Sequence, residues 1–291
     1  MYDTVLVPTD GSDDALRAAE HGAALARAFG ARLHLLAVVD LQAAGGPFDA
    51  GGLDERFRER LRADAEERID ATEAAIPDIE GVRTAIQEGR PVRTILEYAA
   101  EHDVELVSMG TQGRTGVDRY VAGSVAEGVV RQARVPVLTV RDTPQSDTAG
   151  DYGDVLLPTD GSEYAARAVE PGLAIAEQFG ARVHVLHVVD PGDLPDDDAR
   201  VDLVERLESA GDAVTATVAD QVRDRGLEAT TAVREGSPPA AILDYADDEG
   251  VDQIAMGTAG KTGPSRFLLG STTERVIRHA EIPVLAVNAR D

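Results

Sequence analysis

One sequence pattern occurs twice in this chain of 291 residues, and the repeat limits the folds open to it. Residues 8–12, Pro-Thr-Asp-Gly-Ser, recur as residues 158–162, an offset of 150 residues. Residues 135–138, Val-Pro-Val-Leu, recur as Ile-Pro-Val-Leu at 282–285, an offset of 147 residues. A period this long indicates duplicated domains rather than a solenoid of short repeats.

The two copies define the predicted domain boundaries. We expect a first domain over residues 1–142 and a second over residues 153–291. Residues 143–152 are polar and rich in turn formers, which is typical of a linker.

Within the first copy, short apolar segments alternate with segments of helical periodicity. Strands are predicted at residues 4–8, 32–39, 82–87, 104–109 and 135–140, and helices at 13–29, 53–75, 91–101 and from about 124. Strands separated by helices imply a parallel sheet with right-handed crossovers. Near-continuous apolar strands imply that both faces are covered. The predicted fold class is α/β: two tandem Rossmann-like domains, each a five-stranded parallel sheet with helices on both faces.

Ligands of such sheets bind beyond the carboxyl ends of the strands, so the loops there are candidate sites. The first loop carries Asp10 in one copy and Asp160 in the other, each followed by Gly-Ser. One interpretation is a turn with a helix N-cap, because Asp and Ser favour both. The other is a carboxylate that accepts hydrogen bonds from a ribose hydroxyl or an adenine amino group.

The loop after the fourth predicted strand keeps the pattern Gly-x-x-Gly-x9-Gly-Ser in both copies, at residues 110–124 and 257–271. Glycine permits close backbone approach and positive φ. Gly-Ser then leads into a helix whose free N–H groups and dipole favour a phosphate. The alternative is a purely structural glycine loop, but the full spacing at the carboxyl end of a strand in both copies favours phosphate binding.

Residues 255–262, Ala-Met-Gly-Thr-Ala-Gly-Lys-Thr, also fit a loose Walker A pattern. In a true P-loop the Gly-Lys-Thr begins a helix, whereas here Gly-Pro follows and the helix is expected from Ser271. The first copy has Arg114 where Lys261 stands. We interpret the Walker-like match as accidental.

Two weaker features lie in the second predicted strand of each copy or of one copy: the strand end in both, and two histidines in the second. The strand ends in Val38-Val39-Asp40 in the first copy and in Val188-Val189-Asp190 in the second. The backbone there is either a group that pairs with the edge of an adenine ring or simply a strand end. His184 and His187 differ by an odd number, so their side chains point to opposite faces, and structural roles are favoured for both. The six histidines show no metal-ligand spacing, so no metal site is predicted in the protein itself.

The charge balance narrows the range of partners. The chain has 28 Lys and Arg against 53 Asp and Glu, a formal net charge of −25. Such a surface repels nucleic acid and anionic membranes. The chain has no cysteine, which excludes disulfides, thiolate catalysis and cysteine-ligated metals. No transmembrane helix and no secretory signal are expected, so we predict a cytoplasmic protein.

The acidic composition also suggests an environment. The Debye length is about 3 Å at 1 M salt and about 8 Å at physiological ionic strength, so concentrated salt screens repulsion between carboxylates. This surface is similar to those of proteins from salt-loving organisms that keep molar salt in the cell. The alternative is an ordinary acidic cytosolic protein.

The glycine pattern, Pro-Thr-Asp after the first strand and a Pro-Val-Leu closing strand together resemble the universal stress protein family, in its ATP-binding branch. The resemblance covers essentially the whole chain, twice. It implies a bound adenine nucleotide (ATP, ADP or AMP) with Mg²⁺ or Mn²⁺ on its phosphates. It also implies that the closing strands of the two copies pair as an internal pseudo-dimer.

Carried over by residue, the resemblance assigns roles in each copy. Asp10 would meet the ribose or adenine, Val38 the adenine through its backbone, and Met109 the base. The motif glycines and Ser124 would wrap the phosphates, with positive charge from Arg114. The predicted binding residues are Pro8, Thr9, Asp10, Val38, Met109, Gly110, Gly113, Arg114, Gly123, Ser124 and Val125, and Pro158, Thr159, Asp160, Val188, Met256, Gly257, Gly260, Lys261, Gly270, Ser271 and Thr272.

Three functions remain open from the sequence. The first is a stress-response regulatory protein that binds ATP at one or both copies with little turnover, because no obvious general base stands beside a candidate nucleophile. The second is a slow ATPase or autophosphorylating enzyme. The third is a nucleotide-free dimerisation scaffold. A regulatory protein partner, and association of two chains, are also expected from the resemblance without being identified by it.

Overall fold

The computed structural model describes residues 2–41, 55–77, 79, 81–113, 124–146, 151–190, 192, 199–259 and 269–288. It divides into two compact units, Met1–Asp142 (unit 1) and Thr143–Asp291 (unit 2). The predicted linker over 143–152 falls at the start of unit 2. The last residue of this segment, Tyr152, is fully buried. The centroid of its ring lies 4.9 Å from that of Phe179, in an edge-on arrangement.

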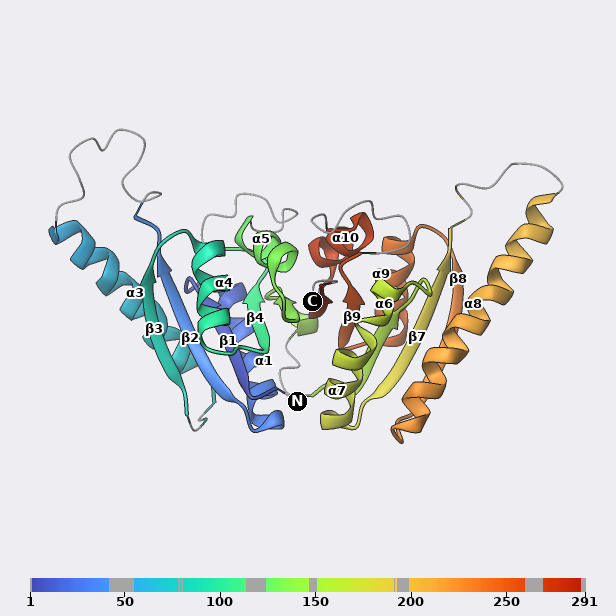
Figure 1. The fold of residues 1–291 in the computed structure, drawn as a ribbon, viewed down its shortest axis with the longest axis horizontal. Helices are drawn as coiled ribbons and strands as arrows, with labels where there is room; N and C mark the ends of the chain where they lie inside the picture. The colour runs from blue at the N-terminus through green and yellow to red at the C-terminus, as the bar shows by residue number, and fades with distance from the viewer. Residues whose placement is uncertain are drawn as a thin grey trace. The chain divides into compact units, whose positions relative to one another are not determined.

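The strands of unit 1 form a parallel sheet in the order β3-β2-β1-β4-β5 (Figure 1). β1 therefore lies in the middle, and the chain reverses its direction across the sheet between β3 and β4. This is the switch point at which doubly wound sheets bind ligands. The strands are β1 (Thr4–Thr9), β2 (Arg32–Val39), β3 (Arg83–Glu88), β4 (Leu106–Gly110) and β5 (Val137–Val140).

The helices of unit 1 cover the sheet in two pairs. α1 contacts α3, and α4 contacts α5. Right-handed crossovers put the first pair on one face and the second pair on the other, because the chain moves across the sheet in opposite directions. The helices are α1 (Asp13–Phe29), α3 (Glu55–Ala75), α4 (Pro91–Glu101) and α5 (Ser124–Gln132).

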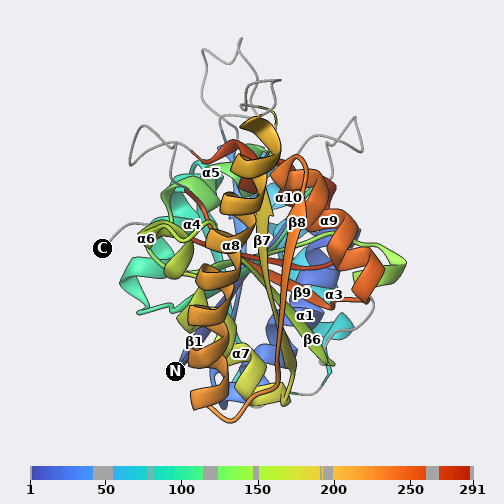
Figure 2. The same ribbon diagram turned by 90° about the vertical axis from the view of Figure 1, so that its right-hand side faces the viewer.

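Unit 2 repeats this arrangement with the strand order β8-β7-β6-β9-β10, again all parallel. The long helix α8 lies along β7 and β8 (Figure 2). A short 3₁₀ turn, η1 (Pro144–Ser146), precedes the first strand. The elements are β6 (Asp154–Pro158), α6 (Glu163–Ala166), α7 (Val169–Phe179), β7 (Arg182–Val189), α8 (Ala199–Asp224), β8 (Ala229–Glu235), α9 (Pro238–Glu249), β9 (Gln253–Gly257), α10 (Ser271–His279) and β10 (Val284–Val287).

The first helix of the repeat is continuous in unit 1 but broken in unit 2. Ser12 caps α1 through its side chain, which accepts a hydrogen bond from Ala15 N. In unit 2, Pro171 stands where α1 has His21, and the helix is interrupted between α6 and α7. Proline has no N–H to donate and its ring clashes with the carbonyl four residues earlier, so the helix restarts with Pro171 in its first turn.

The predicted α/β fold with two tandem parallel sheets is confirmed, and the core is mainly the apolar strands and the inner faces of α1 and α7. The edge strands β3 and β8 are an exception to the expected burial, because their residues are only half-buried or exposed. Edge strands have a neighbour on one side only, so they carry Arg, Thr and Glu. In the described residues, no helix is long and apolar enough to cross a membrane.

Candidate functional site

A cavity of about 580 Å³ lies at the carboxyl ends of β6, β7 and β9 in unit 2. Residues of α6 and α9, Leu207 of α8 and the first residues of α10 complete its wall. Gly260 and Lys261, two of the predicted binding residues, lie outside the described residues. The other predicted residues of the second copy all line the cavity: Pro158, Thr159, Asp160, Val188, Met256, Gly257, Gly270, Ser271 and Thr272.

The turn after β6 places Asp160 at the cavity. Its Oδ1 accepts a hydrogen bond from Ser162 N at 2.9 Å, and Ser162 caps α6 by accepting from Ala165 N at 3.1 Å. Gly161 between them has φ +75°, a conformation that L side chains rarely adopt. The loop therefore forms a turn with a helix N-cap, and Asp160 lines the cavity from this turn.

The matching turn of unit 1 has the same geometry. Asp10 Oδ1 accepts from Ser12 N at 3.0 Å and from Ser12 Oγ at 2.6 Å. A Cβ on Gly113 would lie 2.6 Å from Asp10 Oδ2, so the second motif glycine leaves room for this carboxylate. Thr9 Oγ1 lies 2.8 Å from Thr72 Oγ1 of α3, which attaches the turn to the helix behind it.

The first motif glycine has a packing role that the sequence did not suggest. A Cβ on Gly110 would lie 2.8 Å from Ala15 N, and one on Gly257 would lie 2.3 Å from Tyr164 O. Both contacts are with backbone at the start of the repeat's first helix, which cannot move aside. Only glycine allows that helix to pack against the end of the fourth strand of each copy.

The start of α10 forms the far side of the cavity. Gly270 is its N-cap and no side chain caps the helix. Gly270 N donates to Thr258 O at 2.7 Å, and Thr273 Oγ1 donates to Gly257 O at 2.8 Å. These two bonds hold the helix start against the end of β9, so the N–H groups of its first turn lie at the cavity and favour an anion there.

The structure places the unit 1 counterparts at the corresponding strand ends. Met109 is buried at the end of β4, and exposed Ser124 begins α5, followed by half-buried Val125. β1 ends at Thr9 opposite Ala37, so Val38 has no ladder partner on the β1 side. Arg114 and Gly123 lie outside the described residues.

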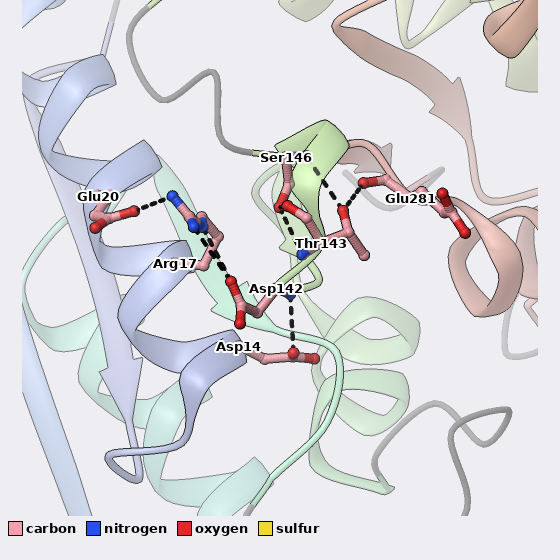
Figure 3. Close-up of polar contacts among 7 residues, drawn as sticks. All are labelled: Asp14, Arg17, Glu20, Asp142, Thr143, Ser146 and Glu281. Carbon is pink, nitrogen blue, oxygen red and sulfur yellow. Dashed lines mark hydrogen bonds and ion pairs between the residues drawn. The ribbon is translucent and has the colours of Figure 1, made fainter.

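One carboxylate of unit 1 ties the glycine loop to the end of the unit. Asp14 Oδ2 accepts hydrogen bonds from Thr111 Oγ1 and Gln112 N, each at 2.8 Å. Asp14 Oδ1 accepts from Asp142 N at 2.9 Å (Figure 3). Tyr164 occupies the corresponding position of unit 2, beside Gly257, and has no carboxylate to offer.

Sequence reasoning missed several residues of the cavity. His187, for which a structural role was favoured, lines it from β7, and Leu207 lines it from α8. No motif marks either residue, although His187 is adjacent to Val188, which was singled out. Val189 and Asp190 also line the cavity and belong to the strand end that the sequence singled out, although they are not in the predicted binding set. The remaining unpredicted lining residues are Ala165, Leu186, Pro238, Ile242, Ala259, Leu269 and Thr273. Within the part of the chain that the structure describes, no group of three acidic or histidine side chains is placed to hold a metal ion.

The sequence profile of the Universal stress protein family matches the chain twice, over residues 1–141 and 151–288. The chain belongs to the universal stress protein family. The family predicted from the glycine pattern is thus confirmed. Each match spans nearly one unit, so this universal stress protein carries the family domain in tandem.

Known relatives of this universal stress protein match it over one copy or over both. Universal stress protein MJ0531 of Methanocaldococcus jannaschii is 37% identical over 139 residues, which cover 47% of this chain and 82% of the relative. A universal stress protein of Mycolicibacterium smegmatis is 27% identical over 305 residues, covering 98% of this chain and 97% of its own. The crystal structure of a universal stress protein from Archaeoglobus fulgidus covers 99% of this chain and 97% of its own, with a TM-score of 0.69 and 24% identity, and supports the tandem fold.

Proposed function

We propose that this universal stress protein is a stress-response regulator that binds an adenine nucleotide at the carboxyl edge of one or both sheets. The observation that carries the proposal is the cavity of unit 2, which brings together residues from three strands and the start of α10. These residues are far apart in the sequence, and they were selected from the sequence as nucleotide-binding residues. Their convergence on one cavity supports a common ligand.

The phosphates are proposed to lie at the start of α10. The exposed Ser271 and its neighbour Thr272 line the cavity and supply first-turn N–H groups without a capping side chain. Uncapped N–H groups and the helix dipole together stabilise an anion. The nearby Glu274 is paired with Arg278, Oε1 to Nη2, at 2.8 Å, which partly offsets its negative charge.

The nucleoside is proposed to lie toward β7. In the order β9-β6-β7, β7 is two strands away from β9, and neighbouring strands are about 4.8 Å apart, so the ends of β9 and β7 lie about 10 Å apart. A nucleotide with its phosphates at α10 spans that distance. Half-buried Val188 then lies beside the base and Asp160 beside the ribose, while buried Met256, near the end of β9, lines the cavity on the side of the phosphates.

A polyanion that enters a protein of net charge −25 needs local compensation. In the proposed complex, the helix N–H groups supply part of it and Mg²⁺ or Mn²⁺ on the phosphates supplies more. Lys261 and Arg114 follow the second motif glycine of their copies and are proposed to add positive charge.

Equilibrium dialysis of the full chain against radiolabelled ATP with Mg²⁺, in concentrated KCl, tests the proposal. We expect saturable binding of one or two ATP per chain. Ser271→Asp should weaken binding at unit 2 by about tenfold or more, because its carboxylate would repel phosphate at close range. The variant should still fold, because an acid in the first turn of a helix is favourable by about 0.3–1 kcal/mol.

Two matched variants complete the experiment. Ser124→Asp makes the same change at the start of α5 and should weaken binding at unit 1. Thr217→Asp adds the same charge on an exposed position of α8 that does not line the cavity, and it should leave ATP affinity unchanged. Absence of ATP binding by the wild type would contradict the proposal. Sustained multiple-turnover release of phosphate would instead identify the protein as an ATPase.

A further inference from the structure

His187 and Gly211 form a pair in unit 2 whose counterparts in unit 1 are both alanine. In the sheets, His187 is in register with Val233 as Ala37 is with Ile86. In the helices, Val214 lies next to Gly161 as Arg68 lies next to Gly11, so Val214 of α8 corresponds to Arg68 of α3. The same offset of 146 residues makes Gly211 the counterpart of Ala65.

The glycine makes room for the imidazole. A Cβ on Gly211 would lie 2.6 Å from His187 Cδ2 and 3.2 Å from Val233 Cγ2, so alanine would not fit beside the ring. In unit 1, Ala37 and Ala65 are both fully buried in one apolar cluster. The change from Ala-Ala to His-Gly therefore keeps the packing of strand against helix, while it replaces a methyl group with a polar ring.

The hydrogen bond of the ring fixes its tautomer. His187 Nδ1 lies 2.8 Å from Thr159 O. A carbonyl oxygen only accepts, so Nδ1 carries the proton and donates it, and Nε2 of the neutral ring keeps its lone pair. Nε2 lies across the ring from Nδ1, so this lone pair points away from Thr159. His187 is half-buried and lines the cavity, and its hydrogen bond to Thr159 uses Nδ1 alone.

We propose that His187 is a specificity-determining residue of unit 2, whose Nε2 accepts a hydrogen bond from a donor on the nucleoside part of the ligand. Unit 1, with Ala37 at this position, lacks the contact, so the two sites differ in ligand preference. This inference rests on the proposed function. It concerns the nucleoside rather than the phosphates, because β7 lies two strands away from the β9 loop and α10.

An adenine nucleotide offers three kinds of donor to such an acceptor: the 6-amino group, the 2′-hydroxyl and the 3′-hydroxyl. The test therefore compares ATP with purine riboside triphosphate, 2′-deoxy-ATP and 3′-deoxy-ATP, each of which lacks one donor. Binding is measured by competition in the Ser124→Asp background, in which only unit 2 binds strongly. Losing one neutral hydrogen bond should weaken the corresponding analogue about three- to tenfold relative to ATP.

Two variants attribute the preference to His187. His187→Ala with Gly211→Ala recreates the pair of unit 1 and should remove the difference between ATP and the affected analogue. His187→Gln with Gly211 retained keeps an acceptor oxygen near the Nε2 position and should preserve the difference in part. A long-range ¹H–¹⁵N spectrum of the ring should show a protonated Nδ1 and an unprotonated Nε2 in the free protein.

The outcomes distinguish a failure of the proposed role of His187 from a failure of the proposed nucleotide binding. Equal penalties for the analogues in the Ser124→Asp protein and in its His187→Ala/Gly211→Ala derivative would overturn the role of His187, while ATP binding itself persists. A ring protonated at Nε2 would also overturn it. If the Ser124→Asp protein binds neither ATP nor any analogue, the proposed function of unit 2 fails, and the role of His187 fails with it.

Discussion

Asp14 Oδ1 accepts a hydrogen bond from the backbone N–H of Asp142, at 2.9 Å (Figure 3). Asp142 is the last residue of unit 1, and its own carboxylate receives two hydrogen bonds from Arg17, each at 3.3 Å. The next residue, Thr143, bonds within unit 2, where its N–H donates to Ser146 Oγ at 3.1 Å and its hydroxyl donates to Glu281 O. The boundary between the units is thus attached to each of them by side-chain hydrogen bonds.

We predict that Asp14→Ala lowers both the stability of unit 1 and its affinity for ATP. The substitution leaves three donors, on Thr111, Gln112 and Asp142, without their shared acceptor. A lost hydrogen bond costs about 0.5–1.5 kcal/mol, and one to a charged acceptor costs more. We expect about 2 kcal/mol in total, most of it from the buried Thr111, because Asp142 is exposed and its N–H can bond to water instead. Urea unfolding and ATP dialysis measure the two effects.

Asp13→Ala is the matched control for this prediction. Asp13 is also an acid in the first turn of α1, but it is exposed and makes none of the loop contacts. Its removal should cost only the favourable interaction with the helix dipole, about 0.3–1 kcal/mol, and should leave ATP affinity unchanged. Equal effects of the two variants would show that the loop contacts of Asp14 contribute nothing measurable.

A second prediction concerns pH and the buried His34 of unit 1. Burial, with a further contribution from the nearby Arg83, lowers the pKa of His34 from 6.5 to about 4. The unfolded chain then binds a proton between pH 6.5 and 4 that the folded chain does not. His34 therefore contributes stability above pH 6.5 that is lost as the pH falls to 4, by about 3 kcal/mol over the full window.

His34→Gln isolates this contribution from the titration of the carboxylates. The amide retains a polar partner for Tyr98, whose hydroxyl lies 3.2 Å from His34 Nδ1, but it does not titrate. We expect unfolding free energies measured between pH 7 and pH 4 to fall less steeply in the variant than in the wild type. Parallel curves would contradict the lowered pKa of His34.

A third prediction is that Gly211 and His187 are energetically coupled. Gly211→Ala alone should destabilise unit 2 by about 1–3 kcal/mol, because the added Cβ would overlap the imidazole. Adding His187→Ala should remove the overlap and recover most of that stability, as the Ala37–Ala65 pair of unit 1 shows for the same packing. A double-mutant cycle by thermal unfolding measures the coupling, and additive effects would contradict the contact.

A fourth prediction follows from the net charge of −25. We expect the protein to lose structure or compactness below a few hundred millimolar KCl, because carboxylate repulsion is then poorly screened. Circular dichroism and small-angle scattering across a KCl series measure this, with sucrose of equal osmolality as a control that does not screen charge. An unchanged circular dichroism spectrum after dialysis into water would contradict adaptation to salt.

Much of the fold was predictable because its signals are local. The helices at Asp13–Phe29 and Pro91–Glu101 were predicted at their observed bounds, since apolar periodicity and terminal residues mark them. The strand predicted from residue 104 begins at Leu106, and the repeat gave no warning that Pro171 breaks a helix that is continuous in unit 1. Local sequence patterns predict that a strand is present, but they do not predict its exact first residue. A strand begins where the neighbouring strand offers a hydrogen-bonding partner.

The sequence by itself determined the tandem α/β architecture, the loops at the carboxyl ends of the strands and nine of the twenty residues that line the cavity, because repeats, periodicity and glycine spacing are properties of the chain. Only the tertiary structure showed that Gly110 and Gly257 make room for backbone, that Asp14 joins two loops, and that Gly211 faces His187. These are contacts between residues distant in sequence. They depend on how each helix packs against the sheet, and no local pattern encodes that.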